Sequence, residues 1–441
     1  MSTSDLSPAA TGSGLFAAVR ARTVRWGWVV FGVGLSSALF VAFVLFHFQG
    51  FIDKDIDPYG FGRMGETVAS GHWFQGDGNL LHRKAPLYPL TIGLVYAVFG
   101  DHDRLIFLLH AFFFAGTCFL AFDIGRRLFN QRAGIIAGLM CALDPVVLRY
   151  VPSLHLEIQF TFYMTLLVWL IVLFYERPSV KLGVLTGVIA GAASLTKSVP
   201  LLLPALMMLA LVLSYRARRR RGASVAVPWK AIVTVFVAMG LTIAPWTIRN
   251  YHATHHFVLI NTGTSDAFLR GFIFTQTPYI TLRKPPYTDA ENASNAYFES
   301  LAAKHGTVWE RDDYETDKIL NQEMKRRLVH EPGAVARKTA IGVATFWYEM
   351  TDLKNSLVAG ALALGAWCLA LVGWRQARRE GKPTWFLFLP ILYFNLVLAF
   401  LLALGRYSVP VMPLLLVMAG FGVDTLLTRR ASHNTRVEVA G

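Results

Sequence analysis

The sequence predicts an all-α membrane protein that crosses the bilayer many times. Of its 441 residues, 54% are hydrophobic and only 16% are charged, whereas a soluble protein usually carries about 25% charged residues. The hydrophobic residues form ten long runs, and a spanning helix needs about 20 predominantly apolar residues. A soluble multidomain protein is therefore excluded. The net charge of +14 does not indicate a nucleic-acid partner, because the basic residues lie between apolar runs and not on a polar surface.

The ten predicted spans define the organisation of the chain. A polar tail, residues 1–25, precedes them, and a second tail, residues 428–441, follows. Residues 26–246 form an N-terminal transmembrane catalytic module, and residues 355–427 form the C-terminal transmembrane helices. The spans cover residues 26–47, 105–125, 133–150, 156–175, 182–197, 199–215, 229–246, 355–374, 384–404 and 408–427.

The distribution of Lys and Arg predicts the orientation of the chain. Basic residues in short connections stay on the cytoplasmic side. With the N-terminus inside, the inner connections hold most of the arginines, including the run 216–221, and the short outer connections hold only Arg149, Lys197 and Arg406. We therefore expect both termini in the cytoplasm, a location in the plasma (inner) membrane, and a topological role for the run 216–221.

Two long segments are predicted to face outward. Residues 48–104 form the first outer loop, which ends in an apolar piece, 86–100, of about fifteen residues. That length is short for a span and typical of an interfacial helix. Residues 247–354 are rich in Asp, Glu, Asn and Thr, with a helix-like charged stretch at 295–330. They predict a small extracytoplasmic cap.

Ionisable residues gather at the outer ends of the spans and in the first outer loop. Such groups are costly at membrane depth and by default mark functional sites. Arg and Lys there would hold a phosphate, and a carboxylate beside the apolar phase could take a proton from an attacking hydroxyl. The combination favours chemistry on lipid-linked phosphate sugars. The candidates are Asp53, Asp55, Asp57, Arg63, Lys84, Arg149, His155, Glu157, Lys197, Arg249 and Arg406.

Several of these candidates also have a structural interpretation. Lys197 could extend to the membrane interface, and Glu157 could stabilise the N-terminus of its helix. Arg249 and Arg406 could be interfacial anchors. The alternating aspartates at 53, 55 and 57 are similar to a metal-chelating DxD, but no α/β unit surrounds them. The residues therefore do not support a divalent metal, and no cofactor is expected.

Six groups of short segments stand out in chain order. They are DPYGFGRMGETVASG at 57–71 with RKAPLYP at 83–89, YVPSLHLE at 150–157, GAASLTK at 191–197, PWTIRNY at 245–251, HEP at 330–332 with FW at 346–347, and GRYSVP at 405–410. In this order they resemble the GT-C glycosyltransferases of the dolichyl-phosphate-mannose protein mannosyltransferase and aminoarabinose transferase type (glycosyltransferase family 39). The resemblance covers about residues 50–415.

The resemblance implies the transfer of a sugar from a polyprenyl-phosphate donor in the membrane to an acceptor on the outer face. The acceptor could be a lipid, a glycan or a protein. Inversion at the anomeric carbon would follow from a single displacement with an Asp base. By carry-over the catalytic residues are Asp57 and its neighbour Asp55; the donor phosphate is bound by Lys84, Arg249 and Arg406; and the pocket is shaped by Glu157, Lys197, Tyr88 and Arg63.

The sequence leaves alternatives open. Pro58 stands where the family often has an acidic residue, so the choice of base among the aspartates at 53, 55 and 57 is not fixed. A polysaccharide polymerase or ligase using polyprenyl-diphosphate donors would have a similar arrangement. A transporter or flippase of an anionic lipid or solute is another class, but transporters place charged sites near the bilayer midplane between repeats. Here the charges lie at one face, and the two halves show no internal symmetry.

Overall fold

The protein is helical wherever its structure is described. The computed structural model describes residues 10–44, 57, 59–72, 84–276, 286–308 and 314–440, and every regular element in these ranges is a helix. The predicted all-α class is thus confirmed for the described ranges. The helices are α1 (Ala10–Phe43), α2 (Phe61–Ala69), α3 (Leu87–Phe99), α4 (Asp103–Leu128), α5 (Gln131–Ala142), α6 (Pro145–Leu148), α7 (Glu157–Glu176), α8 (Val180–Thr196), η3 (Val199–Leu202), α9 (Leu203–Arg220), α10 (Trp229–Thr254), α11 (Thr264–Gln276), α12 (Pro286–Lys304), α13 (Tyr314–His330), α14 (Pro332–Tyr348), α15 (Leu353–Arg379), α16 (Trp385–Phe400), η5 (Gly405–Val411) and α17 (Met412–Ala440).

Seven helical segments of the described chain are long and apolar enough to cross a membrane. They lie in α1, α4, α7, η3 with α9, α10, α15, and η5 with α17, and three shorter apolar helices are α3, α8 and α16. Nine of the ten predicted spans coincide with one of these helices. The apolar piece at 86–100 forms the short helix α3.

The predicted span 133–150 is not one continuous helix. It divides into α5 and α6 at Asp144. Asp144 has an extended backbone, as the residue before a proline usually does, and its Oδ1 accepts a hydrogen bond of 2.8 Å from the backbone nitrogen of Val146. Asp144 therefore follows the end of α5 and caps α6, with Pro145 in the first helical position. Hydrophobicity alone could not locate this break.

Small residues bring some of the helices into close contact. Gly183, Gly187 and Gly191 lie four residues apart on α8, where a Cβ atom would collide with α10 at each position. At Gly187 the colliding atom is the backbone carbonyl oxygen of Val235. Without a hydrophobic driving force between helices in lipid, such small-residue stripes allow the close van der Waals packing that holds them together.

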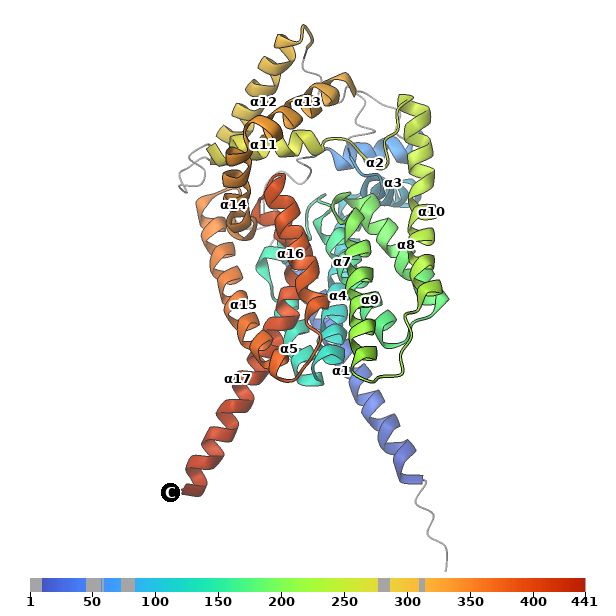
Figure 1. Ribbon diagram of the computed structural model, residues 1–441, viewed down its shortest axis with the longest axis vertical. Coiled ribbons are helices and arrows are strands. Elements are labelled where there is room, and N and C mark those ends of the chain that lie inside the picture. Colours follow the sequence, from blue (N-terminus) through green and yellow to red (C-terminus); the bar gives the residue numbers. More distant parts are fainter. Residues whose placement is uncertain are drawn as a thin grey trace, which may run out of the picture.

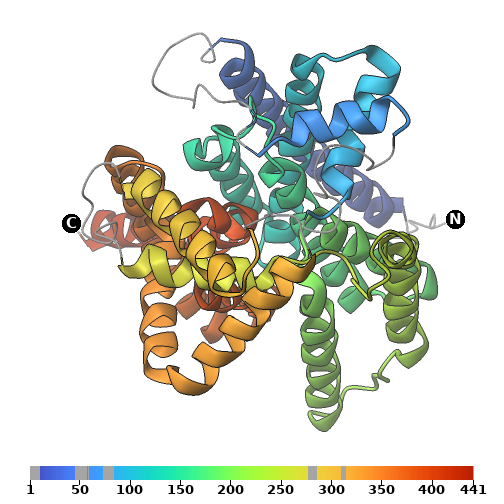
Figure 2. The same cartoon turned by 90° about the horizontal axis from the view of Figure 1, so that it is seen from above.

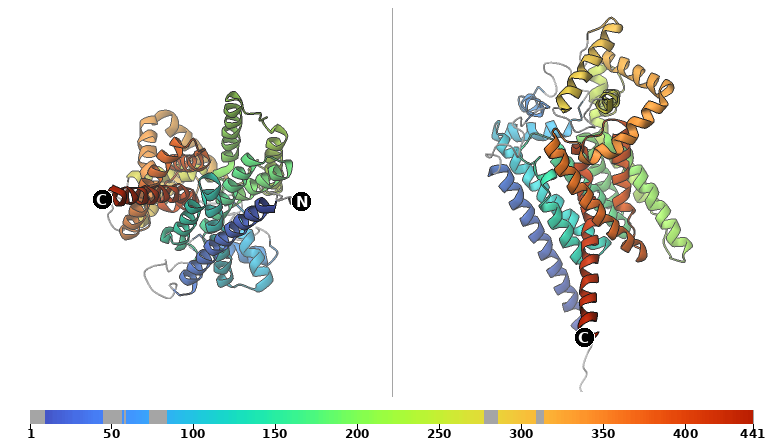
Figure 3. Two further views of the ribbon diagram at one scale, coloured as in Figure 1. Left: turned by 90° about the horizontal axis from the view of Figure 1, so that it is seen from below. Right: turned by 90° about the vertical axis from the view of Figure 1, so that its left-hand side faces the viewer.

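The helices form a bundle with a cap at one end (Figure 1). Helices α11 to α14 make the cap, and Figure 2 shows that they cover the side of the bundle formed by α15 and α16. The beginning of α1 and the end of α17 project from the opposite end (Figure 3). The first and last described residues, Ala10 and Ala440, thus lie on the side away from the cap.

The cap has its own apolar core and a polar attachment to the bundle. Phe268 and Phe298 are fully buried in that core. The buried Lys338 of α14 joins cap to bundle: its Nζ donates to the carbonyl oxygens of Phe268 on α11 (3.2 Å), Leu401 after α16 (2.8 Å) and Phe400. These bonds satisfy the carbonyl groups at the end of α16, which has no further helical turn to pair them.

Candidate functional site

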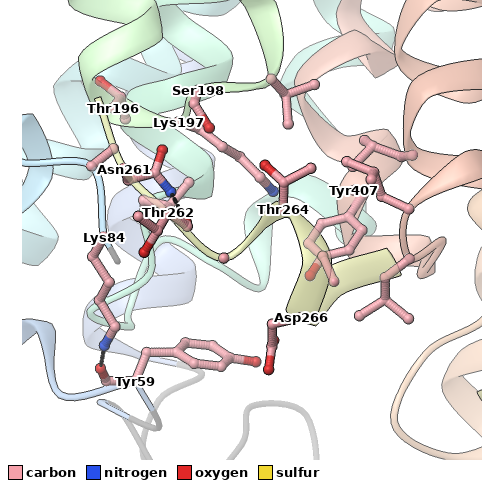
Figure 4. Close-up of a pocket in the computed structure, with 18 of the residues that line it drawn as sticks. Tyr59, Lys84, Thr196, Lys197, Ser198, Asn261, Thr262, Thr264, Asp266 and Tyr407 are labelled. Atoms are coloured by element: carbon pink, nitrogen blue, oxygen red, sulfur yellow. Dashed lines mark hydrogen bonds between the residues drawn. The ribbon is translucent and has the colours of Figure 1, made fainter. Parts of the chain in front are cut away.

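A cavity of about 460 Å³ lies where the cap meets the bundle. Its volume is in the range of small-ligand sites in proteins. Segments from the first outer loop, α7, the end of α8, the start of α11, the end of α16 and η5 all contribute to its wall (Figure 4). The lining residues are Tyr59, Phe61, Lys84, Ala85, Leu156, Glu157, Thr196, Lys197, Ser198, Val199, Asn261, Thr262, Gly263, Thr264, Asp266, Ala267, Leu398, Leu401, Leu402, Arg406 and Tyr407.

Three cations line this cavity, and two tyrosines connect them. Lys84 Nζ donates to the backbone carbonyl of Tyr59, whose hydroxyl group accepts a hydrogen bond from Arg406. Arg406 Nη2 also donates to the hydroxyl of Tyr407 (2.8 Å), and Lys197 Nζ lies 3.9 Å from the centre of the Tyr407 ring. Within the described residues neither Lys197 nor Arg406 forms an ion pair. The wall therefore carries positive charge that can bind an anion.

Two carboxylates line the same cavity. Glu157 is the first residue of α7, with only 5% of its surface exposed. Asp266 lies in the first turn of α11, and its Oδ2 accepts a hydrogen bond of 3.0 Å from Nε of the buried Arg270. Cations and carboxylates thus share a single small space, which can bind a phosphate and accept protons from hydroxyl groups.

Asp57 lies beside the cavity but is not one of its lining residues. Its Oδ1 and Oδ2 accept hydrogen bonds from the backbone nitrogens of Phe61 (2.7 Å) and Gly62 (2.8 Å), at the start of α2. Burial raises the pKa of the Asp57 carboxyl above its ordinary value, while these two hydrogen bonds and the charge of Lys84 act in the opposite direction. The residues Tyr59 and Phe61 connect Asp57 to the cavity wall.

The sequence-predicted site residues are therefore distributed unevenly. The cavity brings together Lys84, Glu157, Lys197 and Arg406, whereas Asp53 and Asp55 lie outside the described residues. The other predicted residues are described and lie off the cavity wall: Tyr88 is buried, with its ring 5.1 Å from that of Phe61; Arg63 is exposed on α2; and the guanidinium carbon of Arg249 lies 4.8 Å from the ring of Trp246.

Several lining residues were not singled out from the sequence. Tyr59 and Tyr407 belong to two of the segments that carry the family resemblance, so their positions were already marked. Thr262 and Asp266 had no comparable signal, because they lie in a polar segment where Asp and Thr are common. Only the folding of that segment over the bundle shows that they face the cavity.

Comparison with known proteins supports the fold. Residues 83–247 match the family model described as dolichyl-phosphate-mannose-protein mannosyltransferase. The structure is similar to that of the Archaeoglobus fulgidus oligosaccharyltransferase in the apo form, with a TM-score of 0.58 and 13% identity over 94% of this chain and 52% of that chain. The same enzyme in complex with an inhibitory peptide and a dolichol-phosphate gives a TM-score of 0.50, 13% identity and coverage of 93% and 52%.

A weaker likeness is to ArnT from Cupriavidus metallidurans bound to undecaprenyl phosphate, with a TM-score of 0.36 and 18% identity over 95% of this chain and 78% of that chain. A search of curated proteins gave no significant match. The chain spans about half the length of the oligosaccharyltransferase that it resembles. The chain has the GT-C fold of membrane glycosyltransferases, as the order of its sequence segments predicted.

Proposed function

We propose that the protein is a membrane glycosyltransferase that moves a sugar from a polyprenyl-phosphate donor to a lipid, glycan or protein acceptor. The observation that carries the proposal is the cavity of a GT-C fold lined by Lys84, Lys197 and Arg406. A phosphate ester at the membrane surface matches this charge. The similar archaeal enzyme solved with a dolichol-phosphate supports the same class of donor.

The proposed reaction is a single inverting displacement. A base accepts the proton of the acceptor hydroxyl while its oxygen attacks the anomeric carbon of the donor sugar. The bond between that carbon and the phosphate oxygen breaks, and polyprenyl phosphate leaves with the electron pair. Lys84, Lys197 and Arg406 stabilise the charge on the departing phosphate. Lys197 here takes the role first expected of Arg249, which lies off the cavity wall.

The base is proposed to be Asp57, whose raised pKa suits a proton acceptor. Glu157 is the competing candidate because its side chain lines the cavity. For Asp57 to act as the base, the acceptor hydroxyl must reach it past the segment that contains Tyr59 and Phe61. The two assignments predict opposite outcomes for the variants Asp57→Asn and Glu157→Gln.

The test uses purified protein in detergent, radiolabelled polyprenyl-monophosphate and polyprenyl-diphosphate sugars, and crude membrane acceptors. We expect wild type and the control Asp101→Asn, an exposed aspartate before α4, to transfer label from a monophosphate donor, and Asp57→Asn to lose transfer. Loss in Glu157→Gln alone would assign the base to Glu157. Transfer only from diphosphate donors would indicate a polymerase or ligase. Saturable binding of lipid phosphate without transfer would indicate a transporter.

A further inference from the structure

The segment 261–267 closes the cavity from the cap side. It runs from the end of the α10 connection into α11, and all of its residues except Ser265 line the cavity. Figure 4 shows the carboxylate of Asp266 and the hydroxyl of Tyr59 facing the same space. Tyr59 is bound to Arg406. Asp266 and the Tyr59 hydroxyl that binds Arg406 therefore border the same space, in which a phosphate would bind.

The carboxylate of Asp266 is hydrogen-bonded at one oxygen and unsatisfied at the other. Arg270 binds Oδ2 and is fixed in turn by Glu291 (2.8 Å) and Asn295 (3.2 Å) of α12. Oδ1 is buried and has no hydrogen-bond partner among the described residues. The buried positive charge of Arg270 keeps the carboxylate in place without occupying both of its oxygens.

Other buried polar atoms around the cavity are unsatisfied as well. Within the described ranges, Thr262 Oγ1 and Arg406 Nε also have no hydrogen-bond partner. Buried polar groups in proteins are nearly always hydrogen-bonded, so each exception requires an explanation. A bound ligand that offers hydroxyl groups to Asp266 and Thr262 and an anionic oxygen to Arg406 would satisfy all three.

We infer that Asp266 and Thr262 bind the hydroxyl groups of the donor sugar. The inference rests on the proposed function, because it takes the cations as the phosphate site. In a polyprenyl-phosphate sugar the ring is bonded directly to the phosphate, so phosphate bound at the cations places the ring within the same cavity. Sugar hydroxyls donate to an ionised carboxylate in strong, charge-assisted hydrogen bonds.

The experiment compares two lipids that differ only in the sugar. Binding to the purified full chain is measured for bare polyprenyl phosphate and for the same lipid carrying mannose, glucose or arabinose. For the sugar lipid that wild type binds most tightly, we expect Asp266→Asn to weaken affinity about tenfold to a hundredfold and Thr262→Val to weaken it less. Affinity for bare polyprenyl phosphate should not change in either variant.

Asp289→Asn is the matched control, since this aspartate is exposed on α12 of the cap. Equal weakening for both lipids, or the same effect in the control, would mean that Asp266 only supports the cap. Unchanged affinity for the sugar lipid in both site variants would also overturn the inference. Thr262→Val provides a second test in case Asp266→Asn misfolds. It should fold normally, because Thr262 Oγ1 has no hydrogen bond among the described residues that the substitution would remove. If wild type binds neither lipid, the proposed function itself fails.

Discussion

The site depends on a few side chains that each make more than one contact. Arg406 binds the hydroxyls of both Tyr59 and Tyr407, so its guanidinium is fixed before any ligand arrives. Fixed cations bind a phosphate at lower cost than mobile ones, because less conformational entropy is lost. Lys84, Lys197 and Arg406 line one cavity, and this convergence favours a binding role over a role as separate interfacial anchors.

Removal of Arg406 should weaken binding of the donor lipid. Arg406→Ala loses charge-assisted hydrogen bonds worth about 1.5 to 3 kcal/mol, which corresponds to roughly a tenfold to hundredfold rise in Kd for polyprenyl phosphate. Arg337→Ala is the control, since Arg337 is exposed on α14 and has no place in the proposed site. Equilibrium binding in detergent measures both. Equal affinities for wild type and Arg406→Ala would show that Arg406 does not bind the phosphate and acts only as an interfacial anchor.

The loss of activity at low pH should follow the protonation of Asp57. Because burial raises the pKa of this carboxyl above 3.8, the base becomes protonated at a higher pH than an ordinary aspartate. Activity is then present above the raised pKa and is lost as the pH falls through it. A profile of kcat/KM against pH should show this limb above pH 3.8. A limb at or below that value would contradict the assignment.

At the scale of elements, two helices pair closely where small residues let their backbones come near each other. The glycines of α8 let it contact α10 closely. In lipid, van der Waals packing of this kind, and not the hydrophobic effect, stabilises the association of helices. The end of α8 carries Lys197, so this pairing also positions one of the cations. A disturbance of the helix pair should therefore reach the site.

Gly187→Ala should destabilise the protein. Its Cβ would collide with the backbone oxygen of Val235, and neither backbone can move aside cheaply. Overpacking of this kind costs about 1 to 3 kcal/mol, which thermal unfolding in detergent should detect as a lower Tm. Gly240→Ala on α10 is the matched control, because nothing lies within 4 Å of its added Cβ. If both variants have the same Tm as wild type, the close packing of α8 against α10 at Gly187 is contradicted.

At the scale of the whole molecule, the site exists only where cap and bundle are joined. Gly271 of α11 contacts the backbone of Leu401 closely, and Lys338 binds carbonyl groups on both sides of the junction. Leu401 also lines the cavity. Docking of the cap thus completes the cavity wall.

Gly271→Ala should loosen the cap. The added Cβ would collide with the carbonyl oxygen of Leu401, forcing α11 away from the end of α16. We expect faster proteolysis in the cap and weaker binding of the sugar-bearing lipid. Gly333→Ala at the start of α14 meets nothing within 4 Å and should leave both unchanged. Proteolysis identical to wild type in Gly271→Ala would show that the cap is not held by this contact.

The orientation of the molecule is a further prediction at this scale. Lys304 is exposed on the cap, and Ser432 is exposed near the end of α17. In a Cys368→Ser background, a membrane-impermeant maleimide added outside intact cells should label Lys304→Cys. It should label Ser432→Cys only after the membrane is opened. The reverse pattern would invert the topology and contradict the positive-inside assignment.

The sequence by itself determined the membrane class, the positions of nine of the ten predicted spans, and the segments that supply Lys84, Glu157, Lys197 and Arg406. These follow from hydrophobicity, charge and short residue patterns, which are properties of neighbouring residues. Only the tertiary structure decided that Thr262 and Asp266 line the same cavity as Lys84, Lys197 and Arg406. Such facts depend on packing between segments far apart in the chain, and no local pattern encodes which of many polar cap residues will be placed over the cavity.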